Sequence, residues 1–297
     1  MNKLIESVWD LSGEICSDLR YVQINENGIS KLSKEISQWL STYETFKTWW
    51  CTKGFTSDSD IVLYELIANS VNYCYWFGDD TLRPGGSQST KMYDLLTQSF
   101  QEMIEIRKTG QYPPQHEVQI IVDSFKSKLI SERFPLLSHR IQHLNEISNT
   151  GSIGDVVRGV PKDSSLLLGY VTQNLSGYSQ DLFLKRTILL ILQLNRRLGL
   201  YEDDAQEFPI AADYQIPKML RFFGCIQYKD GLEKKILSRT LLPENCREEI
   251  EIRAVSILVC KMISDKCECS SNDVDSFLWL NRKKCKDPFH LTVTSNY

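Results

Sequence analysis

The sequence lacks each of the short motifs that would assign a common catalytic mechanism at once. It contains no G-x-x-x-x-G-K-[ST] phosphate loop, no G-x-G-x-x-G fingerprint, no H-E-x-x-H zinc motif and no G-x-S-x-G nucleophile elbow. These absences argue against nucleoside triphosphate hydrolysis, dinucleotide redox chemistry, zinc proteolysis and α/β-hydrolase chemistry. Any active site must therefore be sought in less regular patterns.

An excess of positive charge is also missing. The net charge is -4, so the chain as a whole does not attract nucleic acid or an anionic membrane, and such a partner would need a local basic patch. No apolar run approaches the roughly 20 residues that span a bilayer. We expect a cytoplasmic protein without membrane contact, and nothing in the sequence indicates an obligate protein partner.

The nine cysteines do not form a metal-binding or disulfide pattern. Their number is odd and their spacing irregular, and Cys267 and Cys269 lack a second cysteine pair or nearby histidines. We interpret them as reduced thiols and predict no metal site.

Repeats, low-complexity tracts and long linkers are absent, and alternating β-branched runs are few. Apolar residues recur mostly at helical spacing, and 42% hydrophobic composition is ample for a core. The sequence predicts a mainly α fold with little β structure, and one domain over residues 1–297 with soft seams near 78–90 and 149–155.

One segment predicts a buried central helix. "DLFLKRTILLILQLNRRLG" is apolar nearly all round and ends in a basic turn followed by Gly199. Lys185 and Arg186 lie in its first turns, where the helix dipole disfavours cations. A nearby anion would compensate, either a structural carboxylate or a bound ligand.

Asp213 stands in the apolar stretch "IAADYQIPKMLRFFG". Pro217 predicts that a helix starts there and ends at Gly224, which leaves Asp213 in the loop that enters it. Two interpretations stay open: Asp213 binds loop amides as an Asx turn, or it is an acid in a partly dry pocket beside Tyr214.

In "LIANSVNYCYWFG" the residues Asn69, Asn72, Tyr73 and Trp76 are spaced to share one helical face. Amides combined with flat rings suit a nucleobase, and an aromatic stripe is also typical of an ordinary core.

Towards the C-terminus, Glu249 and Arg253 are spaced as a structural i,i+4 ion pair. "SSNDVDSFLWLNRKK" predicts a capped helix on which Asp275 and Trp279 share a face. His290 lies in "DPFHLTVTSNY" and is the type of lone histidine that usually serves as hydrogen-bonded scaffold.

Taken in order, these segments resemble the queuosine salvage protein family, whose members release queuine from queuosine 5′-phosphate by N-glycosidic hydrolysis. The resemblance covers most of the chain and is carried by "NSVNYCYW", "FPLLSHRIQHLNEI", "FLKRTILLI", "AADYQIPKMLRFFGCIQY", "EIEIRAVSIL", "VDSFLW" and "PFH…Y". It implies a helical fold reminiscent of the helix-hairpin-helix DNA glycosylases, and no cofactor.

The resemblance also implies roles for individual residues. Asp213 matches the active-site aspartate and Lys185 a pocket lysine on the central helix, and Glu249 and Arg253 match supporting positions. The substrate-binding residues that we predict are Asn69, Asn72, Tyr73, Trp76, Tyr214, Gln215, Asp275, Trp279 and His290.

Several positions depart from the family pattern. Gln215 replaces an arginine after "ADY", Leu291 and Val293 replace arginines near the C-terminus, Asn69 replaces an aspartate, and a Gly-Tyr-Trp segment has no counterpart near Met92 to Leu95. The losses at Gln215, Leu291 and Val293 remove cations that would hold a free 5′-phosphate.

Three functions therefore remain. The first is hydrolysis of queuosine 5′-phosphate or a close nucleotide. The second is a DNA glycosylase that flips a bulky modified base, for example in phage DNA as an antiviral defence, with a patch formed by Arg196, Arg197, Lys283 and Lys284. The third is a non-catalytic binding protein that retains the pocket.

Overall fold

The computed structural model describes residues 2–42, 55, 57–76, 86–110, 116–159 and 161–297. Within these ranges the chain is mostly helical, with a single two-stranded sheet, so the predicted mainly α fold is confirmed. Buried apolar side chains from the whole length of the chain form one hydrophobic core cluster. The relation to helix-hairpin-helix glycosylases stays a prediction.

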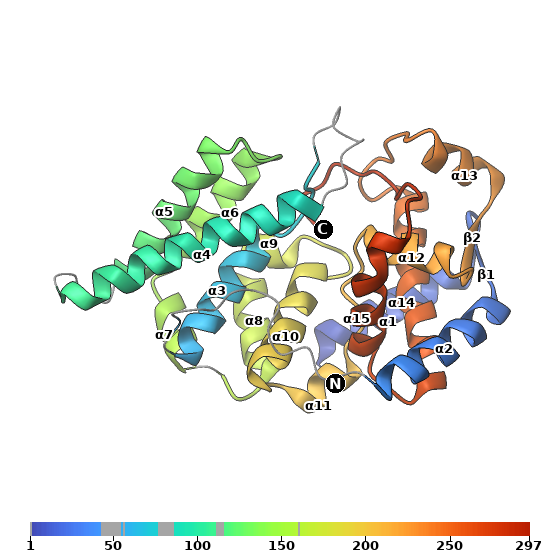
Figure 1. Ribbon diagram of the computed structural model, residues 1–297, viewed down its shortest axis with the longest axis horizontal. Coiled ribbons are helices and arrows are strands. Elements are labelled where there is room, and N and C mark those ends of the chain that lie inside the picture. Colours follow the sequence, from blue (N-terminus) through green and yellow to red (C-terminus); the bar gives the residue numbers. More distant parts are fainter. Residues whose placement is uncertain (1, 43–54, 56, 77–85, 111–115, 160) are drawn as a thin grey trace.

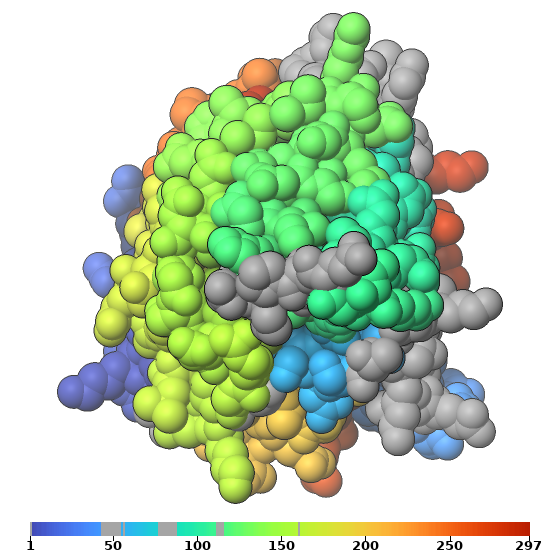
Figure 2. All heavy atoms as spheres, turned by 90° about the vertical axis from the view of Figure 1, so that its left-hand side faces the viewer, coloured from blue at the N-terminus to red at the C-terminus, as the bar shows by residue number. Residues whose placement is uncertain are grey.

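One group of helices surrounds the central helix α10 (Lys185–Leu198). The helix α3 (Asp58–Ser70) packs along α10, and α4 to α6 form an outer layer on the far side of α3. Figure 1 shows this layer at the left, and Figure 2 shows the face that it covers. The other members are α4 (Gly86–Thr109), α5 (Glu117–Ser131), α6 (Leu137–Asn149), α7 (Ile153–Gly159), α8 (Ser164–Asn174), α9 (Ser176–Ser179) and α11 (Glu202–Glu207).

A second group is built on the long helix α14 (Arg247–Cys267), which contacts helices from both ends of the chain. These helices occupy the right-hand part of Figure 1. They are α1 (Lys3–Cys16), α2 (Glu26–Leu40), α12 (Gln215–Phe222), α13 (Asp230–Leu237) and α15 (Ser271–Asn281), the last followed by the 3-10 turn η2 (Arg282–Lys284).

The small sheet fastens the N-terminal segment to this second group. Strand β1 (Val22–Ile24) pairs antiparallel with β2 (Ile226–Tyr228), with Gln23 opposite Gln227. The fully buried carboxylate of Glu251 in α14 accepts the backbone N–H groups of residues 20, 21 and 22 at 2.6–3.1 Å. A buried acid is tolerated because these amides replace its hydration.

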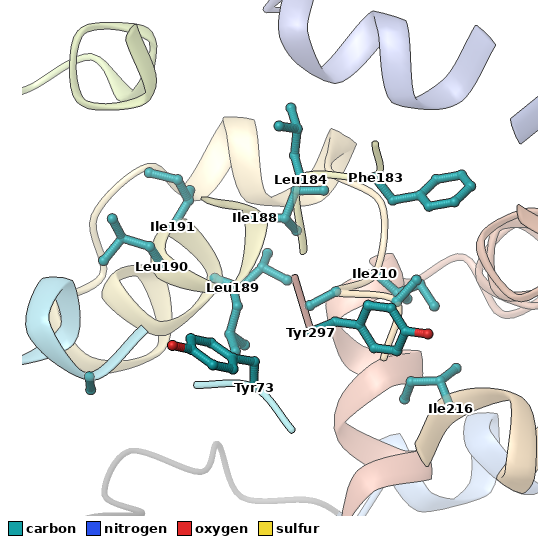
Figure 3. Close-up of a cluster of buried hydrophobic side chains, with 14 of the residues drawn as sticks. Tyr73, Phe183, Leu184, Ile188, Leu189, Leu190, Ile191, Ile210, Ile216 and Tyr297 are labelled. Atoms are coloured by element: carbon teal, nitrogen blue, oxygen red, sulfur yellow. The ribbon is translucent and has the colours of Figure 1, made fainter. Parts of the chain in front are cut away.

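The central helix agrees with its prediction. Nine of its residues, from Lys185 to Leu192 and Leu194, are buried, and Gly199 ends it with φ +66°. Figure 3 shows Ile188, Leu189, Leu190 and Ile191 projecting to different sides of the helix, as a helix enclosed by protein requires.

Two predicted helix boundaries are wrong. Helix α12 begins at Gln215 instead of Pro217, which the first turn accepts because the N–H that proline lacks has no helical partner there. Helix α3 ends at Ser70, so Asn72, Tyr73 and Trp76 do not continue its face. Helix α12 does end before Gly224, whose φ is +71°.

The predicted seams correspond to helix boundaries in part. Residues 150–152, within the second seam, separate α6 from α7, and the seam as a domain boundary stays a prediction. Most of the first seam, residues 78–85, lies outside the described residues, and α4 begins at Gly86 within it.

Glu249 and Arg253 form the predicted ion pair at 3.3 Å, and both are buried. Arg253 also makes a bidentate ion pair with the buried Asp181, with N–O distances of 2.8 and 2.7 Å. Burial alone would raise the pKa of Asp181, but Arg253 lowers it below its ordinary value. The guanidinium also donates from Nε to the carbonyl of Ala212 at 3.1 Å.

Replacing Arg253 by methionine should lower the free energy of unfolding by about 3–5 kcal/mol, because Asp181 would remain buried and charged without its partner. Urea unfolding at neutral pH measures this change. The matched control is Arg158→Met, which removes an arginine that is 58% exposed and should change stability by less than about 0.5 kcal/mol. Equal effects of the two changes would contradict the role given to Arg253.

Candidate active site

A cavity of about 620 Å³ lies where the two groups of helices meet. Its wall comes from α4, α10, α11, α15, η2, the start of α12 with the segment before it, the segment after α3, and Tyr297. The volume is in the range of small-molecule sites. The predicted residues that line it are Asn72, Tyr73, Lys185, Asp213, Tyr214, Gln215, Asp275 and Trp279.

Asp213 combines the two interpretations that the sequence left open. Its Oδ1 accepts the backbone N–H groups of Gln215 at 2.7 Å and Ile216 at 3.3 Å, so it anchors the first turn of α12. Among the described residues, Oδ2 has no hydrogen-bond partner. The loop therefore fixes the carboxylate through one oxygen and leaves the other available at the cavity.

Lys185 lies in the same cavity and is almost fully buried. Its Nζ donates to the carbonyl of Asn72 at 2.9 Å, and its backbone N–H donates to Asp181 at 2.8 Å. Burial lowers the pKa of Lys185 to about 8, and the charge of Asp213 acts in the opposite direction. The anion that the helix start requires is thus Asp181, with Asp213 contributing across the cavity.

The turn after α3 is held by cations bound to its carbonyl groups. Arg186 donates to Ser70, Lys185 to Asn72, and Arg140 to both Tyr73 and Cys74. Arg140 and Arg186 also stack on the ring of Tyr73, at 4.4 and 4.9 Å from its centroid. These contacts place Asn72 and Tyr73 at the cavity without a helix.

Asp275 and Trp279 reach the cavity from α15, whose capping box between Ser270 and Asp273 agrees with the predicted helix start. Arg196 of α10 donates to Asp275 Oδ2 at 3.4 Å and to Ser276 Oγ at 2.6 Å. The guanidinium of Arg282 covers one face of the Trp279 ring at 3.1 Å from its centroid.

The structure places three predicted substrate-binding residues outside the cavity wall. Asn69 donates to Glu65 at the end of α3. Trp76 packs edge-on against Tyr214 at 4.9 Å, behind the wall. His290 is buried against the hydroxyl of Tyr297, and burial lowers its pKa to about 3.

The positions that depart from the family pattern differ in their surroundings. Gln215 lines the cavity, whereas Leu291 is buried outside it and Val293 is 43% exposed. Of the predicted DNA patch, Arg197 is 6% exposed and pairs with the buried Glu65 at 2.7 Å, and Arg196 is directed into the cavity. Lys283 and Lys284 are exposed.

Sequence reasoning missed several lining residues. Tyr75, Tyr93, Gln193, Asn272, Arg282 and Tyr297 also line the cavity. Asn272 and Arg282 lie on or just after the helix that carries Asp275, so its face could have indicated them. Tyr93 and Gln193 carry no local signal.

A family model described as queuosine salvage protein matches residues 52–297. The chain belongs to the queuosine salvage protein family. Two relatives named "Queuosine 5'-phosphate N-glycosylase/hydrolase", from Dictyostelium discoideum and Mus musculus, are 23% and 22% identical over 94% of this chain and 94% and 95% of their own. A third with that name, from Sphaerobacter thermophilus, is 25% identical over 79% of this chain and 80% of its own.

Two further properties of the described residues bear on the predictions. None of the helices has the length and hydropathy to cross a membrane. No group of three metal-ligating side chains is found in the same ranges. The absence of a cofactor stays a prediction.

Lys185 gives a pH-dependent prediction. Because its pKa in the folded protein, about 8, is below the ordinary 10.5, the unfolded chain holds a proton between these values that the folded chain has lost. Unfolding free energy therefore rises with pH across this window. Relative to Lys185→Met, the native protein should gain stability from about pH 7.5 to about pH 9.5 in urea unfolding.

The control is Lys261→Met, which replaces a lysine that is 46% exposed. Its stability difference from the native protein should stay constant over the same interval. A constant difference for Lys185→Met as well would show that the lysine is not buried in its neutral form at high pH.

Proposed function

We propose that this protein hydrolyses the N-glycosidic bond of queuosine 5′-phosphate and releases queuine. The observation that carries the proposal is Asp213, which lies at the cavity with one carboxylate oxygen fixed by helix amides and the other without a partner among the described residues. Family membership and the names of relatives that match over most of their length support it.

Breaking a glycosidic bond builds positive charge on the sugar. A carboxylate next to C1′ stabilises this charge and orients the attacking water. Lys185 provides a positive charge near Asp213. Its Nζ also donates to the Asn72 carbonyl, so the backbone holds this charge in place and it is not a free counter-ion of Asp213. Asp213 acts on the reacting atoms, and Lys185 contributes positive charge to the surroundings of the Asp213 carboxylate.

The leaving base would be bound by the polar and aromatic part of the wall. Asn72 contacts the hydroxyls of Tyr75 and Tyr93, so these three side chains form a connected set. Flat rings provide stacking area, and the amide reads hydrogen-bonding groups of a base. Tyr214 and Trp279 complete the aromatic lining.

Asp213→Asn should abolish queuine release from queuosine 5′-phosphate, with a loss of at least about 100-fold in kcat, because the amide cannot stabilise the developing charge. Mass spectrometry of the free base measures it. The control Asp155→Asn alters a carboxylate that is 76% exposed and should retain activity. Equal queuine release by the Asp213 variant and the native protein would show that another acid acts, and no release by either protein would indicate a binding protein.

A second candidate function is excision of a modified base from DNA. Two observations favour it. Gln215, a neutral residue of the cavity wall, stands where the resemblance to the family implies an arginine, and the basic run "RKKCK" begins at Arg282, which lines the cavity. In that run Arg282 lines the cavity and Lys283, Lys284 and Lys286 are exposed. A phosphodiester in DNA does not need a binding site for a phosphate monoester. Exposed lysines that follow a cavity residue in the chain suit contacts with the DNA backbone.

This function predicts abasic sites in oligonucleotides that carry a bulky hypermodified base, detected by alkaline strand cleavage. Changing Lys283, Lys284 and Lys286 together to glutamate should weaken DNA binding. The slope of the logarithm of the binding constant against the logarithm of salt concentration should become less steep by about one per lost phosphate contact. The control changes Lys31, Lys34 and Lys266, which are exposed elsewhere, to glutamate. Queuine release without any DNA cleavage would exclude this candidate.

A further inference from the structure

Asp213 and Asp275 are two of the carboxylates that line the cavity, and each has one oxygen that is not engaged. Asp213 uses Oδ1 for the amides of α12, and Asp275 uses Oδ2 for Arg196. The remaining oxygens, Asp213 Oδ2 and Asp275 Oδ1, have no hydrogen-bond partner in the part of the chain that the structure describes. Neither is among the polar atoms sealed from solvent without a partner.

The two acids are held in opposite ways. Asp213 is half-buried, and its Oδ1 accepts two N–H groups at the start of a helix. Asp275 is 6% exposed, and its one hydrogen bond among the described residues comes, at 3.4 Å, from a guanidinium that also donates to Asn272 and Ser276. One carboxylate thus has two helix amides as donors, and the other has one long contact from an arginine.

Burial raises the pKa of Asp275 to about 6. Arg196 opposes this shift, whereas the charge of Asp213 adds to it. The titratable or charged groups that act on Asp275 are Arg196 and Lys185 of α10 and Asp213 before α12, and Cys260 of α14 lies near it. Glu202 of α11, Asp273 of α15 and Arg282 of η2 line the same cavity. Pairs of acids whose environments differ in this way divide the acid and base roles in glycosidases.

We propose that Asp275 is the general acid that protonates the departing base while Asp213 serves the sugar. This inference rests on the proposed N-glycosidic hydrolysis, and it holds for either substrate. It also gives a reason for the position of Arg196, which orients the carboxyl through Oδ2 and leaves Oδ1 to face the ligand.

The step balances without a further reactant. The bond from C1′ to the base nitrogen breaks, and both of its electrons go to the base, which takes the proton of Asp275. A water oxygen forms the new bond to C1′ and its proton goes to Asp213. Proton exchange with solvent then restores both acids, so the sum is addition of one water with no change in oxidation.

A pair of leaving groups tests the assignment. Queuine is a poor leaving group that needs a proton, whereas 4-nitrophenolate departs as an anion without one. Asp275→Asn should lose at least about 100-fold in kcat on queuosine 5′-phosphate and less than about fivefold on 4-nitrophenyl β-ribofuranoside 5-phosphate. Asp265→Asn, at a carboxylate that is 61% exposed, should be active on both.

The pH profile of the unaltered protein gives a second measurement that does not depend on the folding of a variant. Because Asp275 must be protonated, kcat for queuosine 5′-phosphate should fall about tenfold per pH unit above its pKa, and kcat for the nitrophenyl substrate should lack this decline. Equal losses on both substrates, or the same alkaline decline on both, would overturn the role of Asp275 alone. If the unaltered protein is inactive on both substrates, the proposed function is overturned together with the role of Asp275.

Discussion

The guanidinium of Arg253 is the contact on which the site depends most. From α14 it binds Asp181, which accepts the first N–H of the helix that carries Lys185, and it binds the carbonyl of Ala212, which directly precedes Asp213. Its flat face lies 4.0 Å from the ring centroid of Tyr297 and 4.7 Å from that of Phe183. One buried cation therefore connects the segments that carry Lys185 and Asp213, without lining the cavity itself.

Positive charge plays an unusual part in this interior. Arg140 and Arg186 are fully buried, and among the described residues they contact carbonyl groups, a neutral histidine and aromatic faces. Burial lowers the pKa of His143 to about 4, and the charge of Arg186 adds to this effect, so it accepts a hydrogen bond as a neutral ring. Carbonyl dipoles take the place of carboxylates, which is possible because the turn after α3 leaves them unpaired.

The sequence predicted the parts of the structure that local rules control. The central helix, its glycine end, the capped helix α15 and the Glu249–Arg253 pair follow from periodicity, capping and i,i+4 spacing. The position of Asp213 before α12 follows from the nearby proline. Contacts between distant segments were not predictable in this way. The end of α3 at Ser70 depends on cations 70 and 116 residues further along the chain, and no local pattern reports them.

The same limit applies to the site. Residues that share a motif with Asp213 or Asp275 were found, whereas Tyr93, Gln193 and Tyr297 enter the cavity only through packing. Trp76 and His290 have suitable chemistry but stand one layer behind the wall. A residue type can indicate binding, but only the tertiary fold decides which neighbours intervene.

The cation-bound turn after α3 has a consequence for the divergence of this family. Its anchors are main-chain carbonyls, which every amino acid supplies, so the path of the turn does not depend on the identity of the side chains that face the ligand. Asn72 and Tyr75 can therefore be exchanged in evolution while the backbone that presents them is conserved. A turn anchored in this way can present different side chains to a ligand after a few substitutions, while the rest of the cavity wall is unchanged.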